Sequence, residues 1–192
     1  MREKSPEAVK RIIMFIFAEK MKENIVHPIP PFYDRKSTIL ILGSFPSVKS
    51  REQLFFYGHP QNRFWKVISS VFGDKEPETV PEKKTFLKRH HVALWDVIGS
   101  CDIEGSSDSS IENVIVNDIS KILNEADIRG VFVNGKTAEK YYKRYIEPKT
   151  GIKAVCLPST SPANAAWSVD KLIDEWKLRI YASERTSFTK ES

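Results

Sequence analysis

Short apolar runs rich in β-branched residues alternate along the chain with longer segments of helical periodicity. The runs that predict strands are Thr38–Leu42, Val92–Trp95, Arg129–Val133 and Lys153–Leu157. The segments that predict helices are Asn62–Phe72, Pro81–Arg89, about Asn117–Ala126, Lys136–Ile146 and Ser168 to about Tyr181. Strands that alternate with helices in this way are typical of a parallel sheet covered on both faces. The pattern therefore predicts an α/β fold: a three-layer α/β/α arrangement with a central four-stranded parallel sheet.

The two ends of the chain depart from this pattern. Residues 1–24 place Pro6 after Ser5 and mix charged residues around an apolar patch, which predicts an additional N-terminal amphipathic helix. The patch, Ile12–Ala18, is far shorter than the roughly twenty apolar residues of a membrane span, and no small-x-small cleavage site follows it. We expect one main domain over residues 25–182 and a frayed tail over residues 183–192.

Composition narrows the class of protein. The chain has 192 residues, of which 41% are hydrophobic, enough for one globular domain with a substantial core. The 30 Lys and Arg exceed the 25 Asp and Glu by five, but these charges are spread along the chain and so permit a polyanionic partner without demonstrating one. Two cysteines, Cys101 and Cys156, are too few for a four-thiolate metal site and fit a reducing compartment.

Four loops follow the predicted strands and hold nearly every unusual residue of the chain. They are Gly43–Gln61, Asp96–Ser110, Asn134–Gly135 and Pro158–Ala166. In open α/β sheets, ligands bind in the crevice beyond the carboxyl ends of the strands. We therefore expect the functional site where these loops meet.

The motifs in these loops carry a family resemblance. The first loop contains Gly43-Ser44-Phe45-Pro46-Ser47 and Tyr57-Gly58-His59-Pro60-Gln61-Asn62-Arg63-Phe64-Trp65, the third strand leads into Asn134-Gly135-Lys136, and the last loop contains Leu157-Pro158-Ser159-Thr160-Ser161-Pro162-Ala163-Asn164. From about His27 to Trp176 the chain resembles the uracil-DNA glycosylase superfamily, and most of all its hypoxanthine-DNA glycosylase (DNA-deoxyinosine glycosylase) family. The resemblance implies a DNA repair glycosylase that hydrolyses the N-glycosidic bond of a deaminated base, with hypoxanthine favoured, and leaves an abasic site.

The resemblance implies a catalytic set of Asn62, Ser44 and Asp96. Most relatives hold the attacking water with an Asp or Asn in the first motif, but this chain has Phe45 there, beside Ser44. The similarity points instead to Asn62, whose amide oxygen we expect to align the water, although Asn62 is also a good helix N-cap. Asp96 is a candidate for reading the N–H group of the base, or secondarily for activating water; a loop-capping role without a ligand is the alternative.

The resemblance also implies residues that bind the base and the DNA backbone. Tyr57 falls where relatives stack an aromatic ring on the extruded base, a contact worth roughly 1–3 kcal/mol, whereas ordinary packing under the loop is the alternative. Phe45 and Trp95 complete the expected base-binding set. The expected DNA-binding residues are Ser159, Thr160, Ser161, Pro162, Ala163, Asn164 and Lys136.

Two other functions stay open at this stage: a mismatch-specific uracil/thymine-DNA glycosylase, and a catalytically silent nucleic-acid-binding module. The last loop lacks the histidine with which uracil-specific relatives stabilise the leaving base, which argues against strong uracil activity. No lysine stands in a pocket motif, so the chain predicts a monofunctional enzyme without a Schiff-base step. We expect a monomer in the cytoplasm, associated with the nucleoid in a prokaryote, that acts on single- or double-stranded DNA without a metal, another cofactor or a membrane.

Overall fold

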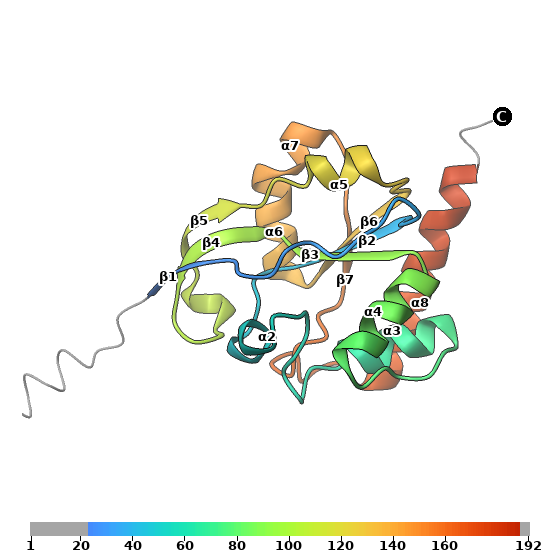
Figure 1. Ribbon diagram of the computed structural model, residues 1–192, viewed down its shortest axis with the longest axis horizontal. Helices are drawn as coiled ribbons and strands as arrows, with labels where there is room; N and C mark the ends of the chain where they lie inside the picture. The colour runs from blue at the N-terminus through green and yellow to red at the C-terminus, as the bar shows by residue number, and fades with distance from the viewer. Residues whose placement is uncertain (1–22, 189–192) are drawn as a thin grey trace, which may run out of the picture.

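The computed structural model describes residues 23–188, which form two sheets with helices around them (Figure 1). The strands are β1 (Glu23–Val26), β2 (Ile39–Gly43), β3 (Val92–Asp96), β4 (Ile98–Ile103), β5 (Glu112–Val116), β6 (Gly130–Asn134) and β7 (Val155–Leu157). The helices are α2 (Val48–Gln53), α3 (Phe64–Phe72), α4 (Val80–Arg89), α5 (Ser120–Glu125), α6 (Lys136–Tyr145), α7 (Glu147–Thr150) and α8 (Val169–Phe188), with a 3₁₀ turn, η1, at Asp108–Ser110. None of the helices in this part of the chain is long and apolar enough to cross a membrane.

The central sheet confirms the predicted fold class. Its four strands lie in the order β3-β2-β6-β7 and all pair in parallel. All five residues of β2 are buried, as expected for a strand covered on both faces. Because the strands are parallel, their carboxyl ends meet at one edge of the sheet, where Gly43 of β2 pairs with Asp96 of β3.

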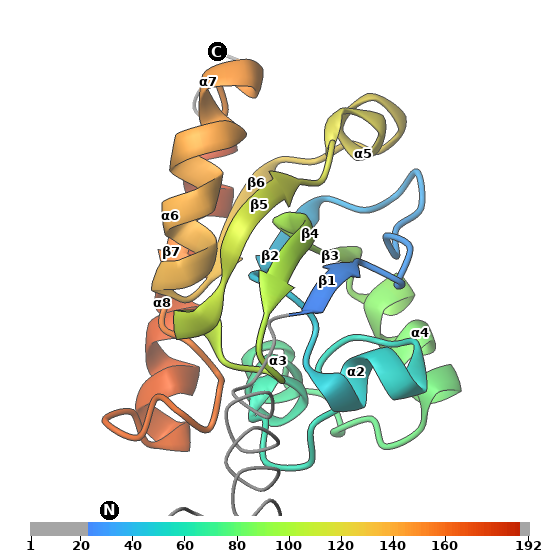
Figure 2. The ribbon, with the colours of Figure 1, turned by 90° about the vertical axis from the view of Figure 1, so that its left-hand side faces the viewer.

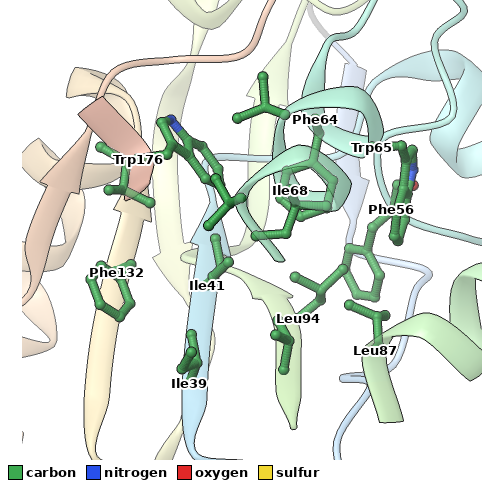
Figure 3. Close-up of a cluster of buried hydrophobic side chains, with 14 of the residues drawn as sticks. Ile39, Ile41, Phe56, Phe64, Trp65, Ile68, Leu87, Leu94, Phe132 and Trp176 are labelled. Carbon is green, nitrogen blue, oxygen red and sulfur yellow. The ribbon is translucent and has the colours of Figure 1, made fainter. Parts of the chain in front are cut away.

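Alternate residues of β2 pack into two separate hydrophobic cores. Ile39 and Ile41 face a core that contains aromatic and aliphatic side chains of α3, α4 and α8, among them Phe64 and Trp176 (Figure 3). Leu40 and Leu42 face the opposite core, which is closed by α5, α6 and the second sheet. This period-two alternation explains the three layers, because each face of the strand buries its own set of apolar side chains.

The second sheet was not predicted. It is antiparallel, with strand order β1-β4-β5, and its strand β4 takes up residues 98–103 of the segment Asp96–Ser110, which we expected to be a loop (Figure 2). Gly, Ser and Asp disfavour strands, so propensity alone hides β4. Its apolar residues Ile98, Cys101 and Ile103 are nevertheless buried in the second core. Burial against the central sheet therefore decides the conformation of this segment.

Strand β3 runs into β4 through a single residue, Val97. The backbone N–H groups of Val97 and Ile98 donate to the carbonyls of Gly43 and Ser44, at 2.8 and 3.0 Å. The side-chain amide of Asn117 donates to the carbonyls on both sides of this link, which explains why α5 begins at Ser120 and not near Asn117. The link fixes the end of β3 against the first motif.

The ends of the chain differ in part from the expectation. Residues 1–22 of the predicted N-terminal helix lie outside the described residues, and Glu23 and Asn24 belong to β1. Helix α8 runs to Phe188, into the expected tail, because the segment after Ser183 continues with the helix formers Glu184 and Arg185. Residues 189–192 of that tail lie outside the described part.

Candidate active site

A cavity of about 110 Å³ opens at the carboxyl ends of the parallel strands. All four loops that were predicted to meet there contribute to its wall. It is lined by Gly43, Ser44, Phe45, Pro46, Ser47, Ser50, Phe56, Tyr57, Asn62, Asp96, Ser106, Asp108, Asn134, Ser159 and Ser161. Its volume is comparable to the ~150 Å³ of an engineered cavity that binds benzene, so one planar ring system is a suitable occupant.

Asp96, the last residue of β3, presents a buried carboxylate to this cavity and is held by His27. His27 Nε2 lies 2.7 Å from Asp96 Oδ2, and the two side chains are 2% and 6% exposed. Because His27 Nδ1 accepts the backbone N–H of Ile29 at 3.2 Å, the ring proton lies on Nε2 and is donated to Asp96. Within residues 23–188, Asp96 Oδ1 has no hydrogen-bond partner, and it is therefore available to a donor on a ligand.

Gly43 gives the Asp96 carboxylate its space. A Cβ atom at Gly43 would lie 2.1 Å from Asp96 Oδ1 and 3.3 Å from the Tyr57 hydroxyl oxygen. The first distance is far below van der Waals contact, and Asp96 is buried, so a side chain here would push the carboxylate away. The glycine of the first motif is thus required by close approach of a functional group and not by an unusual backbone angle.

The Asn62 side chain is tied into the protein by its oxygen. Asn62 Oδ1 accepts the backbone N–H of Phe64 at 3.0 Å and the hydroxyl of Thr160 at 3.0 Å. A backbone N–H can only donate, so the amide cannot be turned around without leaving that group unpaired at the start of α3. The sequence-based expectation that this oxygen aligns water therefore needs revision: the amide nitrogen, for which the described residues provide no acceptor, is the free end in the cavity that Asn62 lines.

Asn134, at the end of β6, fixes the position of Thr160, which in turn bonds to Asn62. Its Nδ2 donates to Thr160 Oγ1 at 3.0 Å, and its Oδ1 accepts the backbone N–H of Thr160 at 3.1 Å. The Thr160 hydroxyl donates onward to Asn62 Oδ1, because an amide oxygen can only accept. A chain of buried polar groups therefore links three loops and sets the direction of the Asn62 amide.

Tyr57 is held rigidly beside the cavity. Its ring stacks on Phe64, with ring centroids 3.8 Å apart and planes 12° from parallel, and its backbone adopts a positive φ of 53°. The hydroxyl is buried and makes no hydrogen bond among the described residues. Burial, with the negative charge of Asp96 nearby, raises the pKa of Tyr57 far above its ordinary value, so the phenol stays protonated. Tyr57 thus lines the cavity while its ring packs on Phe64, so the packing role that we considered as the alternative is present.

The other predicted side chains of the base pocket have different positions. Ser44 lines the cavity and donates to Asp108, with 3.1 Å to each carboxylate oxygen. Phe45 also lines the cavity and packs edge-on against His27, with ring centroids 5.8 Å apart. Trp95 is not among the cavity residues: its Nε1 donates to the carbonyl of Ile29 at 3.2 Å, and its ring packs against both cores. Trp95 therefore supports the segment that carries His27 and lies outside the wall of this cavity.

The last loop is shaped by Arg63, the residue after Asn62. Its guanidinium donates to backbone carbonyls of four loop residues: Thr160, Ser161, Asn164 and Trp167. The carbonyl groups of the loop thus engage the hydrogen-bond donors of the Arg63 side chain. This planar group with five donors fits a ring of carbonyls in a way that lysine cannot.

A second, larger cavity of about 490 Å³ adjoins the first along this loop. It is lined by Asp108, Gly135, Lys136, Thr137, Cys156, Leu157, Pro158, Ser159, Ser161, Ala163, Asn164, Trp167 and Arg179. Of the expected DNA-binding residues, Thr160 is buried and bonds only inward, and Pro162 is exposed. Lys136 is exposed and pairs with Glu139 at 2.8 Å. The other expected DNA-binding residues, Ser159, Ser161, Ala163 and Asn164, line this second cavity together with the basic side chains of Lys136 and Arg179.

The sequence did not predict the polar contacts that three residues make at or near the cavity: His27 with Asp96, Asn134 with Thr160, and Asp108 with Ser44. His27 meets Asp96 across 69 positions of sequence, a separation that no local pattern reveals. Asp108 stands in a serine-rich stretch that looks like an ordinary loop. Within residues 23–188, no three His, Cys, Asp or Glu side chains gather closely enough to hold a metal ion.

Comparison with known proteins adds an independent line of evidence. Residues 30–182 match the family model of the Uracil DNA glycosylase superfamily. The chain is 35% identical over 153 residues to a hypoxanthine DNA glycosylase of Methanosarcina acetivorans. The aligned region covers 77% of this chain and 93% of the relative. It is 34% identical over 137 residues to a hypoxanthine DNA glycosylase of Methanosarcina barkeri, covering 70% and 85%.

Solved structures agree with the fold. A solution NMR structure of a candidate uracil DNA glycosylase from Methanosarcina acetivorans has a TM-score of 0.70 and 31% sequence identity to this chain. The similarity covers 83% of this chain and 99% of that one.

Proposed function

The chain belongs to the uracil DNA glycosylase superfamily, and from that membership we propose that it is a DNA glycosylase that releases hypoxanthine from deoxyinosine by hydrolysis. Both relatives at 34–35% identity are hypoxanthine DNA glycosylases, which favours hypoxanthine over uracil. One structural observation carries the proposal. A ring-sized cavity presents Asp96 Oδ1 and the Asn62 amide nitrogen, neither of which has a hydrogen-bond partner within residues 23–188, together with the ring of Tyr57.

Base recognition follows from the hydrogen-bonding groups in the cavity. Hypoxanthine carries an N–H group next to a carbonyl, and Asp96 Oδ1 accepts from that N–H. Adenine has a lone pair at the same ring nitrogen, which would face the carboxylate without a proton between them, so adenine is rejected. Stacking on Tyr57 contributes roughly 1–3 kcal/mol and offsets much of the cost of rotating the nucleotide out of the duplex.

Bond cleavage needs a water molecule held on the far side of the sugar from the departing base. The Asn62 amide nitrogen donates to the oxygen of this water and leaves a lone pair of that oxygen directed at the anomeric carbon. The amide is too weak a base to take a proton, so its contribution is orientation. Thr160 and Asn134 keep the amide in the required direction through their hydrogen bonds.

The second cavity provides room for the DNA backbone. Ser159 and Ser161 line both cavities, and Lys136 and Arg179 supply positive charge along the outer one. Backbone contacts of this type position DNA without reading its sequence. No amine lines the inner cavity among the described residues, and we therefore propose hydrolysis alone, with an abasic site as product and no strand cleavage.

A substrate panel tests the proposal. Duplexes that contain deoxyinosine, deoxyuridine, a G·T pair or only normal bases are incubated with the protein, and alkali then reveals abasic sites. The proposal predicts release from the deoxyinosine duplex at the highest rate. Faster release from deoxyuridine would make the chain a uracil glycosylase, and salt-sensitive binding without any release would make it a binding module.

Asn62 variants test the role of the amide. Asn62→Asp keeps an oxygen for Phe64 and Thr160 but replaces the free N–H₂ group with an oxygen, so the rate of hypoxanthine release should fall by roughly 10². Asn62→Ala should do the same and also lose about 1 kcal/mol of stability with the hydrogen bond that Asn62 Oδ1 accepts from the Phe64 N–H. The exposed Asn124 on α5 provides the matched control, Asn124→Ala. An Asn62→Asp variant as active as wild type would refute orientation by the amide nitrogen.

A further inference from the structure

A second carboxylate reaches the candidate site from an unexpected part of the chain. Asp108 belongs to η1, between β4 and β5 of the antiparallel sheet, and lines the inner cavity as well as the outer one. Three residues line both cavities: Asp108, Ser159 and Ser161. Asp108 is the ionisable group among them. It therefore lies at the junction between the two spaces.

That junction has a chemical meaning if the proposed function holds. When the base fills the inner cavity and the backbone follows the outer one, the sugar that joins them lies at their boundary. The N-glycosidic bond and the attacking water are then next to the residues that both cavities share. A carboxylate at this place faces the carbon on which positive charge develops as the bond breaks.

Ser44 holds Asp108 in this position. The Ser44 hydroxyl lies 3.1 Å from both carboxylate oxygens, and Ser44 itself is anchored where its carbonyl accepts the N–H of Ile98 at 3.0 Å. The first motif lacks its own acidic or amide side chain because Phe45 stands there. Through Ser44, this motif instead positions a carboxylate that comes from a residue 64 positions away.

The surroundings of Asp108 suit a proton acceptor. The residue is exposed to solvent, although the protein encloses its carboxyl on several sides. Desolvation by this enclosure raises the pKa of Asp108, and hydrogen bonds from Ser44 and Thr137 act in the opposite direction. A carboxylate with a raised pKa is a stronger base, which favours removal of a proton from water.

We propose that Asp108 is the general base that removes a proton from the attacking water. This inference rests on the proposed glycosylase function and adds the group that the orienting Asn62 amide cannot supply. In the step, the water oxygen forms a bond to the anomeric carbon and the C–N bond breaks. The electron pair of the broken bond leaves with the base. One proton of the water passes to the Asp108 carboxylate, and the departing base takes up a proton from solvent.

Other ionisable groups near Asp108 affect the pH dependence that this role predicts. Asp96 lies in the wall of the same cavity, and its charge raises the pKa of Asp108. Burial is the main cause that raises the pKa of Cys101, to about 11, and the pKa of Tyr141, and the charge of Asp108 adds a smaller contribution to each. These two groups stay neutral while a carboxylate titrates. The basic groups nearby are Arg51, which donates to Gly105 of the same loop, and Lys136 and Arg179 of the outer cavity.

The experiment compares three variants with wild type in single-turnover release of hypoxanthine from a deoxyinosine duplex, from acid to neutral pH. Asp108→Asn still accepts from Ser44 but cannot take a proton, so its rate should fall by about 10² or more while DNA affinity changes only a few fold. Ser44→Ala removes a hydrogen bond that lowers the pKa of Asp108. In the Ser44→Ala variant, the acid limb of the pH–rate profile should therefore move to higher pH. Asp127→Asn changes an exposed carboxylate far from both cavities and should behave as wild type.

Each outcome decides the role of Asp108. Wild type that releases no base from any duplex overturns the proposed function and this inference together. Active wild type with an equally active Asp108→Asn variant and an unchanged pH profile overturns the inference alone. If Asp108→Asn loses its cooperative thermal transition, Ser44→Ala decides: an acid limb that stays in place refutes the role, and a limb at higher pH supports it.

Discussion

Replacement of Arg63 by lysine should separate the shape of the last loop from the positive charge at its base. In the structure, the Arg63 guanidinium donates hydrogen bonds to four loop carbonyls. The backbone N–H of Arg63 also donates to the Thr160 carbonyl, at 3.1 Å. A lysine ammonium keeps the charge but can satisfy only part of this ring. Hydrogen bonds to charged groups contribute about 1.5–3 kcal/mol each, and the site is partly hydrated, so a net loss of about 2–4 kcal/mol is expected.

That loss is a large share of the 5–15 kcal/mol by which a domain is ordinarily stable, but it leaves the protein folded. Urea denaturation followed by tryptophan fluorescence measures it directly, because the Trp167 carbonyl accepts from Arg63 and Trp176 Nε1 donates to the Pro158 carbonyl of the same loop. The rate of hypoxanthine release should fall as well, since the same loop carries the Thr160 hydroxyl that directs Asn62. A variant with unchanged urea midpoint and unchanged rate would refute the view that Arg63 shapes the site.

Three further substitutions probe the cavity wall. Gly43→Ala places a methyl group against the Asp96 carboxylate, so release should fall by about 10² although overpacking costs only about 1–3 kcal/mol in a thermal melt; retained activity would contradict the proposed Asp96 contact. Thr160→Val removes the hydroxyl between Asn134 and Asn62 and should lower single-turnover release about tenfold, with a stability loss of about 1–3 kcal/mol. Tyr57→Phe removes a buried hydroxyl that has no partner among the described residues, so the melting temperature should stay equal or rise and release should stay within about threefold, whereas a large loss of rate would show that the hydroxyl contacts the base.

The parallel sheet was predictable from sequence because its signal is local and repeated. Each of its strands is a short apolar run, and each is followed by a loop that carries unusual residues. The meeting of these loops at one edge follows from parallel pairing alone, so the position of the cavity was also predictable. Each end of the four parallel strands lies within two residues of its predicted position.

The polar details of the site depend on contacts that no local pattern encodes. The direction of the Asn62 amide is set by Thr160, which is 98 positions away, and the hold on Asp96 comes from His27. Asp108 was missed because it stands in η1, in a serine-rich stretch that follows β4, and the Gly and Asp residues of β4 have weak strand propensity. Burial in the second core outweighs that propensity, and this can be judged only when the whole fold is assembled.

Direct detection of the released base tests the central claim most sharply. The protein is incubated in excess with a duplex that contains one deoxyinosine, and the products are separated without alkali and identified by mass spectrometry. The account predicts one free hypoxanthine for each abasic site formed, on a strand that remains intact until alkali is added. Strand cleavage without alkali, or an intact deoxyinosine after prolonged incubation, would contradict it.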